Sequence, residues 1–345
     1  MVWATLLMGH SRLSGEITMK PSRISEVLES MIGGRWPVFV WGPPGCGKSS
    51  VVRSVADKLG LGILDIRASL LDPTDLRGIP TVVNGRAVWC PPSFLPQKSD
   101  KPGVLFFDEL NAAPPLVQAS LYQLTLDRRV GEYELPDGWS IVAAGNRSED
   151  RSVVYRMPSA LTNRFLHVDF EVDYDDWRAW AYTAKVHPVI IGFLSLRREL
   201  LHNMKSVERA FPTPRSWEMA SAAISRMGSL TACADVLVGT VGEGAASELL
   251  SYEKRAITEK QVNDIIKNPD TASLPVALGD VYALVSYLVS SAHVSSMSHV
   301  IGRLLNRLSP EMAILLARDV LRVQPKLRKD PGFQSFIQQH AKSLL

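Results

Sequence analysis

The sequence has 345 residues, enough for about two or three domains at roughly 100–200 residues each. Apolar residues make up 46% and charged residues 21%, so wholesale disorder, a collagen-like repeat and a disulfide-rich miniprotein are excluded. The 38 basic residues nearly balance the 35 acidic ones, which argues against nucleic acid as the main partner. The three cysteines lie far apart and form no CxxC pair, as expected in a reducing cytoplasm.

Residues 1–20 are expected to form an N-terminal arm. Their apolar stretch lacks the preceding basic residues of a secretory signal, so a signal peptide is not expected. No membrane span is predicted. The best candidate, residues 274–294, includes Asp280 and many small polar residues, whereas a span needs about 20 mostly apolar ones. Both observations favour a cytoplasmic location.

Five short apolar runs alternate with longer helical stretches in the first half of the sequence. The runs lack the alternation of a half-exposed strand, so they are typical of strands that are buried on both faces. The pattern predicts a mainly parallel sheet of five strands with helices on both sides. The predicted strands are residues 37–41, 63–66, 104–107, 141–144 and 166–170.

A glycine-rich loop follows the first predicted strand and has the pattern G-x-x-x-x-G-K-S, with a helical stretch after it. Its glycines allow consecutive backbone N–H groups to point inward and form an anion site, beside the positive end of the helix. Lys48 can reach the outer phosphates of a nucleotide, and the Ser49 hydroxyl can ligate Mg²⁺. The predicted nucleotide-binding residues are Gly42, Pro43, Pro44, Gly45, Cys46, Gly47, Lys48, Ser49 and Ser50.

Two stretches between the strands have the turn residues of β-hairpins. In residues 78–89, Asn84-Gly85 stands between two short β-prone runs, and this dipeptide is a strong hairpin signal. Residues 129–139 show a similar pattern before the fourth strand. Each hairpin could contact a partner or only extend the edge of the sheet.

Two acidic residues, Asp108 and Glu109, end the third predicted strand. In open α/β sheets ligands bind at the carboxyl ends of the strands, so both carboxylates are expected beside the glycine-rich loop. Asp108 is placed to hold Mg²⁺, directly or through water. Glu109 is placed to orient and deprotonate a water molecule that attacks the γ-phosphate. The sequence has no N-K-x-D guanine-reading motif, which favours ATP over GTP.

Three polar residues further along the chain complete the candidate site. Asn146 ends the fourth strand, where its amide could position the attacking water or equally belong to a turn. Arg164 is a candidate arginine finger, a cation that reaches the γ-phosphate of a neighbouring subunit; the alternative is a surface salt bridge. Arg215 lies in the first turn of a helix that Thr213 caps, where the dipole disfavours a cation, and this suggests a bound anion.

These motifs, in this order, resemble those of AAA+ ATPases and specifically of the MoxR family. By this resemblance the glycine-rich loop is the Walker A motif, and Asp108 with Glu109 is the Walker B motif. Asn146 is then sensor 1, Arg164 the finger and Arg215 sensor 2 in a helical lid.

The resemblance extends over residues 21–222 and leaves the contact between subunits open at one point, because Arg151 and Arg156 remain alternatives to Arg164. The two hairpins resemble the helix-2 insert and the pre-sensor hairpin of the family. In related rings these loops face the central pore or the partner. The C-terminal stretch is not covered by the resemblance.

The resemblance implies a five-stranded parallel P-loop sheet sandwich, a helical lid and a helical C-terminal extension. It further implies an enzyme that hydrolyses ATP with Mg²⁺, forms a homo-oligomeric and hexameric ring, and remodels or activates a client protein or complex. Similar proteins often act with a partner that carries a von Willebrand factor A domain. The expected domains are residues 1–20 (arm), 21–175 (nucleotide-binding domain), 176–270 (lid) and 271–345 (extension).

Two other functions stay open at this point. A DNA-directed AAA+ loader or helicase would share the motifs, although the near-even charge and the lack of a winged-helix or helix-turn-helix signal count against it. A scaffold that binds ATP only to assemble would also share them, but Glu109 and Arg164 would then have no role.

Overall fold

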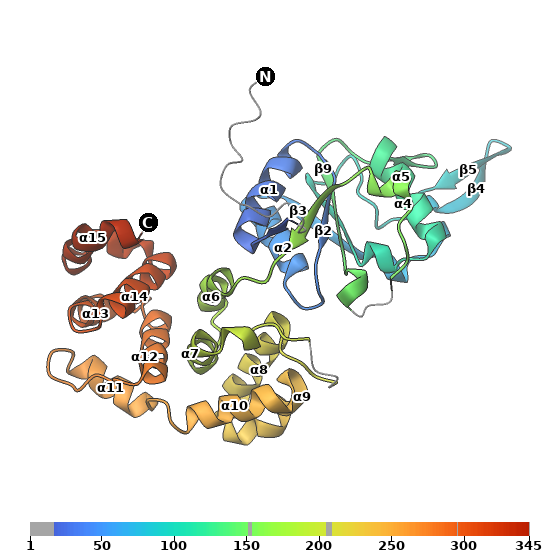
Figure 1. Ribbon diagram of the computed structural model, residues 1–345. Coiled ribbons are helices and arrows are strands. Elements are labelled where there is room, and N and C mark those ends of the chain that lie inside the picture. The colour runs from blue at the N-terminus through green and yellow to red at the C-terminus, as the bar shows by residue number, and fades with distance from the viewer. Residues whose placement is uncertain (1–16, 151–153, 205–208, 295, 345) are drawn as a thin grey trace. The chain divides into compact units, whose positions relative to one another are not determined.

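The computed structural model in Figure 1 describes residues 17–150, 154–204, 209–294 and 296–344. The chain divides into two compact units, Met1–Glu171 and Val172–Leu345. Each unit has a hydrophobic core of its own. Most of the predicted arm, residues 1–16, lies outside the described residues.

A parallel sheet forms the centre of the first unit, with the strand order β1-β10-β2-β9-β6-β3. The predicted sheet of five parallel strands is confirmed. A short strand, β1 (Thr18–Met19), extends it at the edge beside β10, and two residues are too few to leave a hydrophobic pattern in the sequence. The predicted strands are β2 (Val38–Trp41), β3 (Gly62–Arg67), β6 (Gly103–Asp108), β9 (Trp139–Gly145) and β10 (Leu166–Phe170).

Helices cover both faces of the sheet, so side chains on either side of each central strand are buried. Phe39, Leu105 and Phe107 point to the face with α4 and α5, where they share a core with Leu121. The helices of this unit are α1 (Pro21–Gly33), α2 (Lys48–Lys58), α3 (Pro73–Arg77), α4 (Pro115–Asp127) and α5 (Ser159–Thr162).

Both predicted hairpins are confirmed. Strands β4 (Ile79–Val83) and β5 (Arg86–Cys90) pair antiparallel around Asn84-Gly85, and both turn residues have positive φ angles, 51° and 75°. Strands β7 (Arg129–Val130) and β8 (Tyr133–Glu134) form the second, shorter hairpin before β9.

The second unit is helical, and one hydrophobic core extends through it from Tyr174 to Phe336. The helical C-terminal region is therefore confirmed, while the boundary at residue 270 stays a prediction. None of the helices in the described ranges has both the length and the apolar character to cross a bilayer. The helices are α6 (Tyr174–Thr183), α7 (Pro188–Leu196), α8 (Pro214–Met227), α9 (Ala234–Val241), α10 (Glu243–Glu253), α11 (Glu259–Lys267), α12 (Leu278–Ser290), α13 (Met297–Leu305), α14 (Pro310–Val323) and α15 (Pro331–Leu344).

A buried ion pair joins α6 to α14 in this second core. The Arg178 guanidinium donates to Asp319 Oδ1 at 3.3 Å, and both side chains are only 1% exposed. Arg178 also reaches Asp175, at 3.2 Å, but the Asp175 side chain is 41% exposed. The pair is therefore closed to solvent on its Asp319 side.

Candidate nucleotide-binding site

The glycine-rich loop lies between β2 and α2, and its backbone depends on glycine. Gly45 and Gly47 have φ angles of 72° and 109°, in the left-handed region that other residues rarely adopt. At Gly42 a Cβ atom would lie 2.8 Å from the Cβ of Phe170, so no side chain fits there. The Gly42 N–H donates to Gly145 O at 3.2 Å, which fixes the start of the loop to β9. The N-terminus of α2 therefore lies directly after this glycine-rich loop, and the end of a helix with free N–H groups favours an anion.

Lys48, the first residue of α2, is only 8% exposed. Its ammonium donates three hydrogen bonds, to Gly42 O at 2.6 Å, to Pro43 O at 3.0 Å and to Asn146 Oδ1 at 2.9 Å. Two of the predicted site residues, Lys48 and Asn146, are thus in direct contact. These hydrogen bonds hold the Lys48 ammonium beside the glycine-rich loop. A bound anion can replace the oxygens as the acceptor of the Lys48 N–H groups.

Ser49 and Asp108 meet at the carboxyl end of β6. The Ser49 hydroxyl donates to Asp108 Oδ2 at 2.8 Å, and Asp108 Oδ1 accepts a bond from the Glu109 N–H at 3.0 Å. Both side chains are half-buried. A hydroxyl and a carboxylate are the oxygen donors that Mg²⁺ prefers, so this pair fits a magnesium ion beside bound phosphates.

Glu109 has a left-handed backbone, with φ 56° and ψ 35°, which is uncommon for a residue with a side chain. Such conformations cost free energy and gather at functional sites. Its carboxylate accepts a hydrogen bond from Ser69 Oγ at 2.8 Å. Ser69 belongs to a short turn after β3, and the pairing of β3 with β6 brings it to Glu109. Sequence reasoning missed Ser69, because no motif surrounds it.

Asn111 is a second residue that sequence reasoning missed, and its side chain holds the backbone of Asn146. Its Nδ2 donates to the backbone oxygen of Asn146 at 2.7 Å, and the side chain is buried. A Cβ at Gly145 would lie 2.3 Å from Asn111 Oδ1, so glycine at this position makes room for the amide. The only sequence signal was its place three residues after Asp108.

Arg164 follows α5 and lies against α4 rather than against the glycine-rich loop. Its guanidinium carbon is 5.8 Å from the centroid of the Tyr122 ring, and the side chain is half-buried. Among the residues that the structure describes, its Nε atom has no hydrogen-bond partner. Of the two alternatives, Arg156 is exposed and Arg151 lies outside the described residues.

Known proteins share this part of the chain. The family model of the AAA domain (dynein-related subfamily) matches residues 37–165, from β2 to the end of the segment with Arg164. Protein MoxR of Methylorubrum extorquens is 28% identical over 177 residues, which cover 48% of this chain and 49% of MoxR. Protein NorQ of Paracoccus denitrificans is 28% identical over 153 residues, covering 42% of this chain and 56% of NorQ.

Residues 37–165 are thus an AAA domain, and about half of the chain is similar to the MoxR-family proteins MoxR and NorQ. The chain spans about half the length of the MoxR and NorQ chains that it matches. A shorter match is to the RuvB subunit of the Holliday junction branch migration complex of Parabacteroides distasonis, 33% identical over 94 residues, covering 27% of this chain and 23% of RuvB. The family resemblance drawn from the motifs is confirmed.

Arg215, the predicted sensor 2 residue, belongs to the second unit. It is the second residue of α8 and is exposed. The predicted cap is confirmed, because Thr213 Oγ1 accepts from the Ser216 N–H at 3.0 Å and Pro214 begins the helix. A cation in a first helical turn is unfavourable unless an anion binds nearby.

Cys46 is the one side chain of the glycine-rich loop that carries a thiol. It is buried, and burial raises the pKa of the thiol above its ordinary value. The sulfur therefore stays protonated and weakly nucleophilic at neutral pH.

Proposed function

We propose that this protein is a MoxR-type AAA+ ATPase, which hydrolyses ATP and uses the energy to remodel or activate a client protein or complex. The observation that carries the proposal is the convergence of the Lys48 ammonium with the Ser49–Asp108 pair, at the carboxyl edge of the sheet and the start of α2. A binding site for a nucleoside triphosphate with Mg²⁺ needs a cation for the phosphates, oxygen ligands for the metal and a helix N-terminus, and all three are present here.

The loop residues would bind and orient the nucleotide. Backbone N–H groups of residues 45–49 would donate to phosphate oxygens, and Lys48 would exchange the carbonyl oxygens of Gly42 and Pro43 for the outer phosphates. Bound Mg²⁺ supplies charge neutralisation on the phosphates, and Ser49 with Asp108 would hold it. The side chains present therefore fit both ATP and Mg²⁺.

Glu109 would take the proton from the attacking water. The Ser69 hydroxyl holds its carboxylate at 2.8 Å, and the left-handed backbone turns it away from the strand. The Asn146 amide, supported by Asn111, would help to position the same water.

Assembly into a homo-oligomeric, hexameric ring would place Arg164 at the nucleotide of a neighbouring subunit. Two observations support this role. The cation–π contact with Tyr122 orients the Arg164 guanidinium, and its Nε has no hydrogen-bond partner among the described residues. By family likeness we further propose that Arg215 acts as sensor 2. We also propose a cytoplasmic location and a partner with a von Willebrand factor A domain, both by family likeness.

The hairpin β4–β5 would contact the client or the partner. Its Ile79 and Val82 side chains are 75% and 74% exposed and so leave apolar surface that a client or partner could cover. Deleting residues 82–87 should keep basal turnover within a few-fold and remove stimulation by a client. Complete loss of turnover in a folded variant would instead place the hairpin in the active site or between subunits.

Two variants test the chemistry. Lys48→Ala should abolish nucleotide binding, because it removes the cation for the phosphates. Glu109→Gln should bind ATP with unchanged affinity but lose turnover by a factor of about 10² to 10⁴, because only proton transfer is lost. Phosphate release and equilibrium binding measure the two effects. Normal hydrolysis by Glu109→Gln would reject Glu109 as the base, and no hydrolysis by the unaltered protein would favour the ATP-binding scaffold.

A DNA-directed motor is the second candidate, and the match to RuvB over 94 residues is the observation in its favour. Contacts with DNA phosphates make affinity fall steeply with salt. Fluorescence anisotropy with duplex and four-way-junction DNA at increasing salt separates the two candidates. Tight binding with a steep slope would support the DNA motor, whereas no binding at low salt would reject it.

A further inference from the structure

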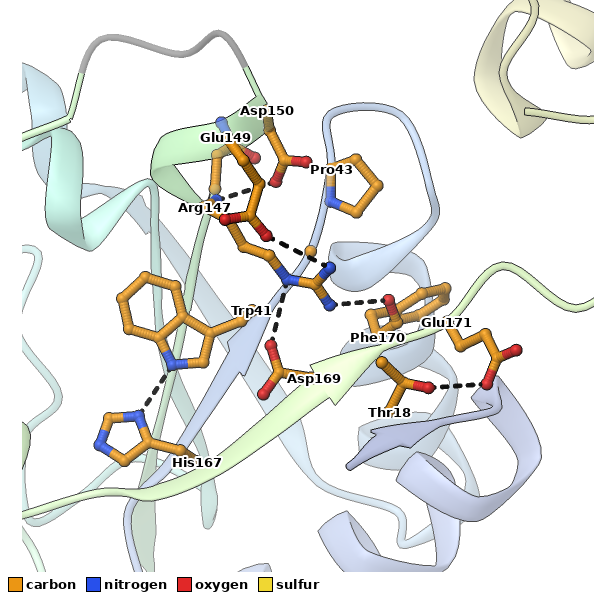
Figure 2. Close-up of polar contacts among 12 residues, drawn as sticks. Thr18, Trp41, Pro43, Arg147, Glu149, Asp150, His167, Asp169, Phe170 and Glu171 are labelled. Atoms are coloured by element: carbon orange, nitrogen blue, oxygen red, sulfur yellow. Dashed lines mark hydrogen bonds and ion pairs between the residues drawn. The ribbon is translucent and has the colours of Figure 1, made fainter. Parts of the chain in front are cut away.

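His167 connects the strand that leads into Walker A with the segment that carries Arg164. In Figure 2 the Trp41 indole N–H points at the imidazole, and it donates to His167 Nδ1 at 2.8 Å. The other ring nitrogen, Nε2, lies 2.8 Å from the backbone oxygen of Thr162. Trp41 is the last residue of β2 and directly precedes Gly42, whereas Thr162 is the last residue of α5.

The two partners fix the state of the imidazole. An indole N–H can only donate, so Nδ1 must accept and carry no proton. A carbonyl oxygen can only accept, so Nε2 must carry the proton and donate to Thr162. The hydrogen bonds therefore assign a neutral His167 in a single tautomer.

Aromatic contacts also hold His167 and its hydrogen-bonded neighbours in place. The His167 ring stacks on Trp41 at 6.0 Å between centroids, and the Phe39 ring lies 5.8 Å away. Phe165, the neighbour of Arg164, meets Phe39 edge-on at 5.5 Å. The segment with Arg164 is thus fastened to β2 at two points, by a hydrogen bond before the arginine and by an aromatic contact after it.

We propose that His167 is a positioning residue for Arg164. Its Nε2–H holds the carbonyl of Thr162, two residues before the arginine, and its Nδ1 fixes this bond to the Walker A strand through Trp41. The inference rests on the proposed role of Arg164 as a finger for the neighbouring subunit. It adds that the finger of each subunit is aimed by the strand that carries the same subunit's Walker A motif.

A positioning role predicts a defect in the neighbouring site. Without His167 the subunit keeps Lys48, Ser49 and Asp108 in place, because the Trp41 indole loses only an acceptor. Its own nucleotide site stays competent while its finger is misplaced. If His167 instead supported the loop through Trp41, the defect would lie in its own site and ATP affinity would fall.

Conservative substitutions separate the two bonds of the imidazole. In His167→Gln the amide N–H can reach the position of Nε2 and keep the bond to Thr162. In His167→Asn the shorter amide keeps an acceptor for Trp41 but does not reach Thr162. We expect His167→Gln to retain most turnover, and His167→Asn to lose about 10- to 100-fold, the cost of a small misplacement in an active site, with ATP affinity within two-fold of normal.

Mixed rings give the decisive test. Subunits with His167→Asn are mixed with Lys48→Ala subunits, which have a good finger but no usable site, and separately with Arg164→Ala subunits, which have a good site but no finger. Phosphate release is measured after native mass spectrometry has confirmed mixed rings. We expect recovered turnover with Lys48→Ala and no recovery with Arg164→Ala, because in the second mixture every interface lacks a correctly placed finger.

The opposite pattern, recovery only with Arg164→Ala or a large loss of ATP affinity, would overturn the positioning role alone. The control mixture of Lys48→Ala with Arg164→Ala tests the proposed role of Arg164 as a finger for the neighbouring subunit. If this control recovers no turnover in confirmed mixed rings, the finger in trans fails, and the inference fails with it. Equal activities of His167→Gln and His167→Asn would also overturn the inference, since the bond to Thr162 would then have no effect.

Discussion

Each of the two units buries a cation, and the surroundings of the two cations differ. Lys48 in the first unit lies at the mouth of a loop and donates to backbone carbonyls and an amide oxygen. Arg178 in the second unit lies between two helices and donates to the carboxylate of Asp319, where both partners are 1% exposed. Lys48 is 8% exposed and is held by neutral oxygens, whereas Arg178 is 1% exposed and is neutralised by a carboxylate. Burial of a charge therefore does not mark a functional site by itself; its place at the carboxyl edge of a parallel sheet does.

The largest effect is expected from breaking the closed pair. Asp319→Ala leaves Arg178 buried without its main counter-charge, which should lower the free energy of unfolding by about 3–5 kcal/mol. Asp175→Ala is the matched control, because it removes another carboxylate partner of Arg178 that is 41% exposed, and it should cost at most about 1 kcal/mol. Calorimetric unfolding measures both.

Substitution of the other buried cation, Lys48, should affect nucleotide binding rather than stability. Lys48→Ala should abolish nucleotide binding with little change in the unfolding transition of the nucleotide-free protein. If Lys48→Ala and Asp319→Ala lowered the unfolding temperature equally, the distinction between the two buried cations would be wrong.

A smaller effect is expected from crowding the support of the site. In Gly145→Ala the new methyl group would lie 2.3 Å from Asn111 Oδ1, so Asn111 must move and release the backbone of Asn146. We expect turnover to fall by about 10- to 100-fold. Gly62→Ala in β3 is the control, because its nearest neighbour would be at 3.7 Å, an ordinary contact. Steady-state ATPase rates compare the variants; equal rates would show that Asn111 does not position Asn146.

The smallest effect concerns access to the loop. Because burial raises the pKa of Cys46, iodoacetamide should alkylate it about tenfold or more slowly than the exposed Cys90 at neutral pH. Raising the pH increases the thiolate fraction and should speed the reaction. Saturating ATP should slow labelling of Cys46 further and leave Cys90 unchanged. Peptide mass spectrometry gives both rates. If the labelling rate of Cys46 were the same with and without ATP, nucleotide binding at this loop would be contradicted.

Local patterns in the sequence were sufficient for the elements and for several site residues. The glycine-rich loop could be predicted because its left-handed positions and its Lys-Ser pair are neighbours in the chain. The Asn84-Gly85 hairpin and the Thr213 cap were predictable for the same reason, since each depends on two to four consecutive residues. The five buried strands followed from their continuous apolar runs.

Contacts between distant segments were decided only by the tertiary structure. Ser69 meets Glu109 because β3 pairs with β6 in a register that sets Arg67 opposite Asp108. Asn111 reaches Asn146 across the neighbouring strand ends.

The His167 bridge belongs to the same class, because it needs Trp41 and Thr162 on either side of one imidazole. A periodic pattern records which face of a strand is buried, but not which strand lies beside it or in what register. The sequence by itself therefore determined the chemistry of the loop and the acidic pair, whereas strand order and register determined which side chains hold them in place.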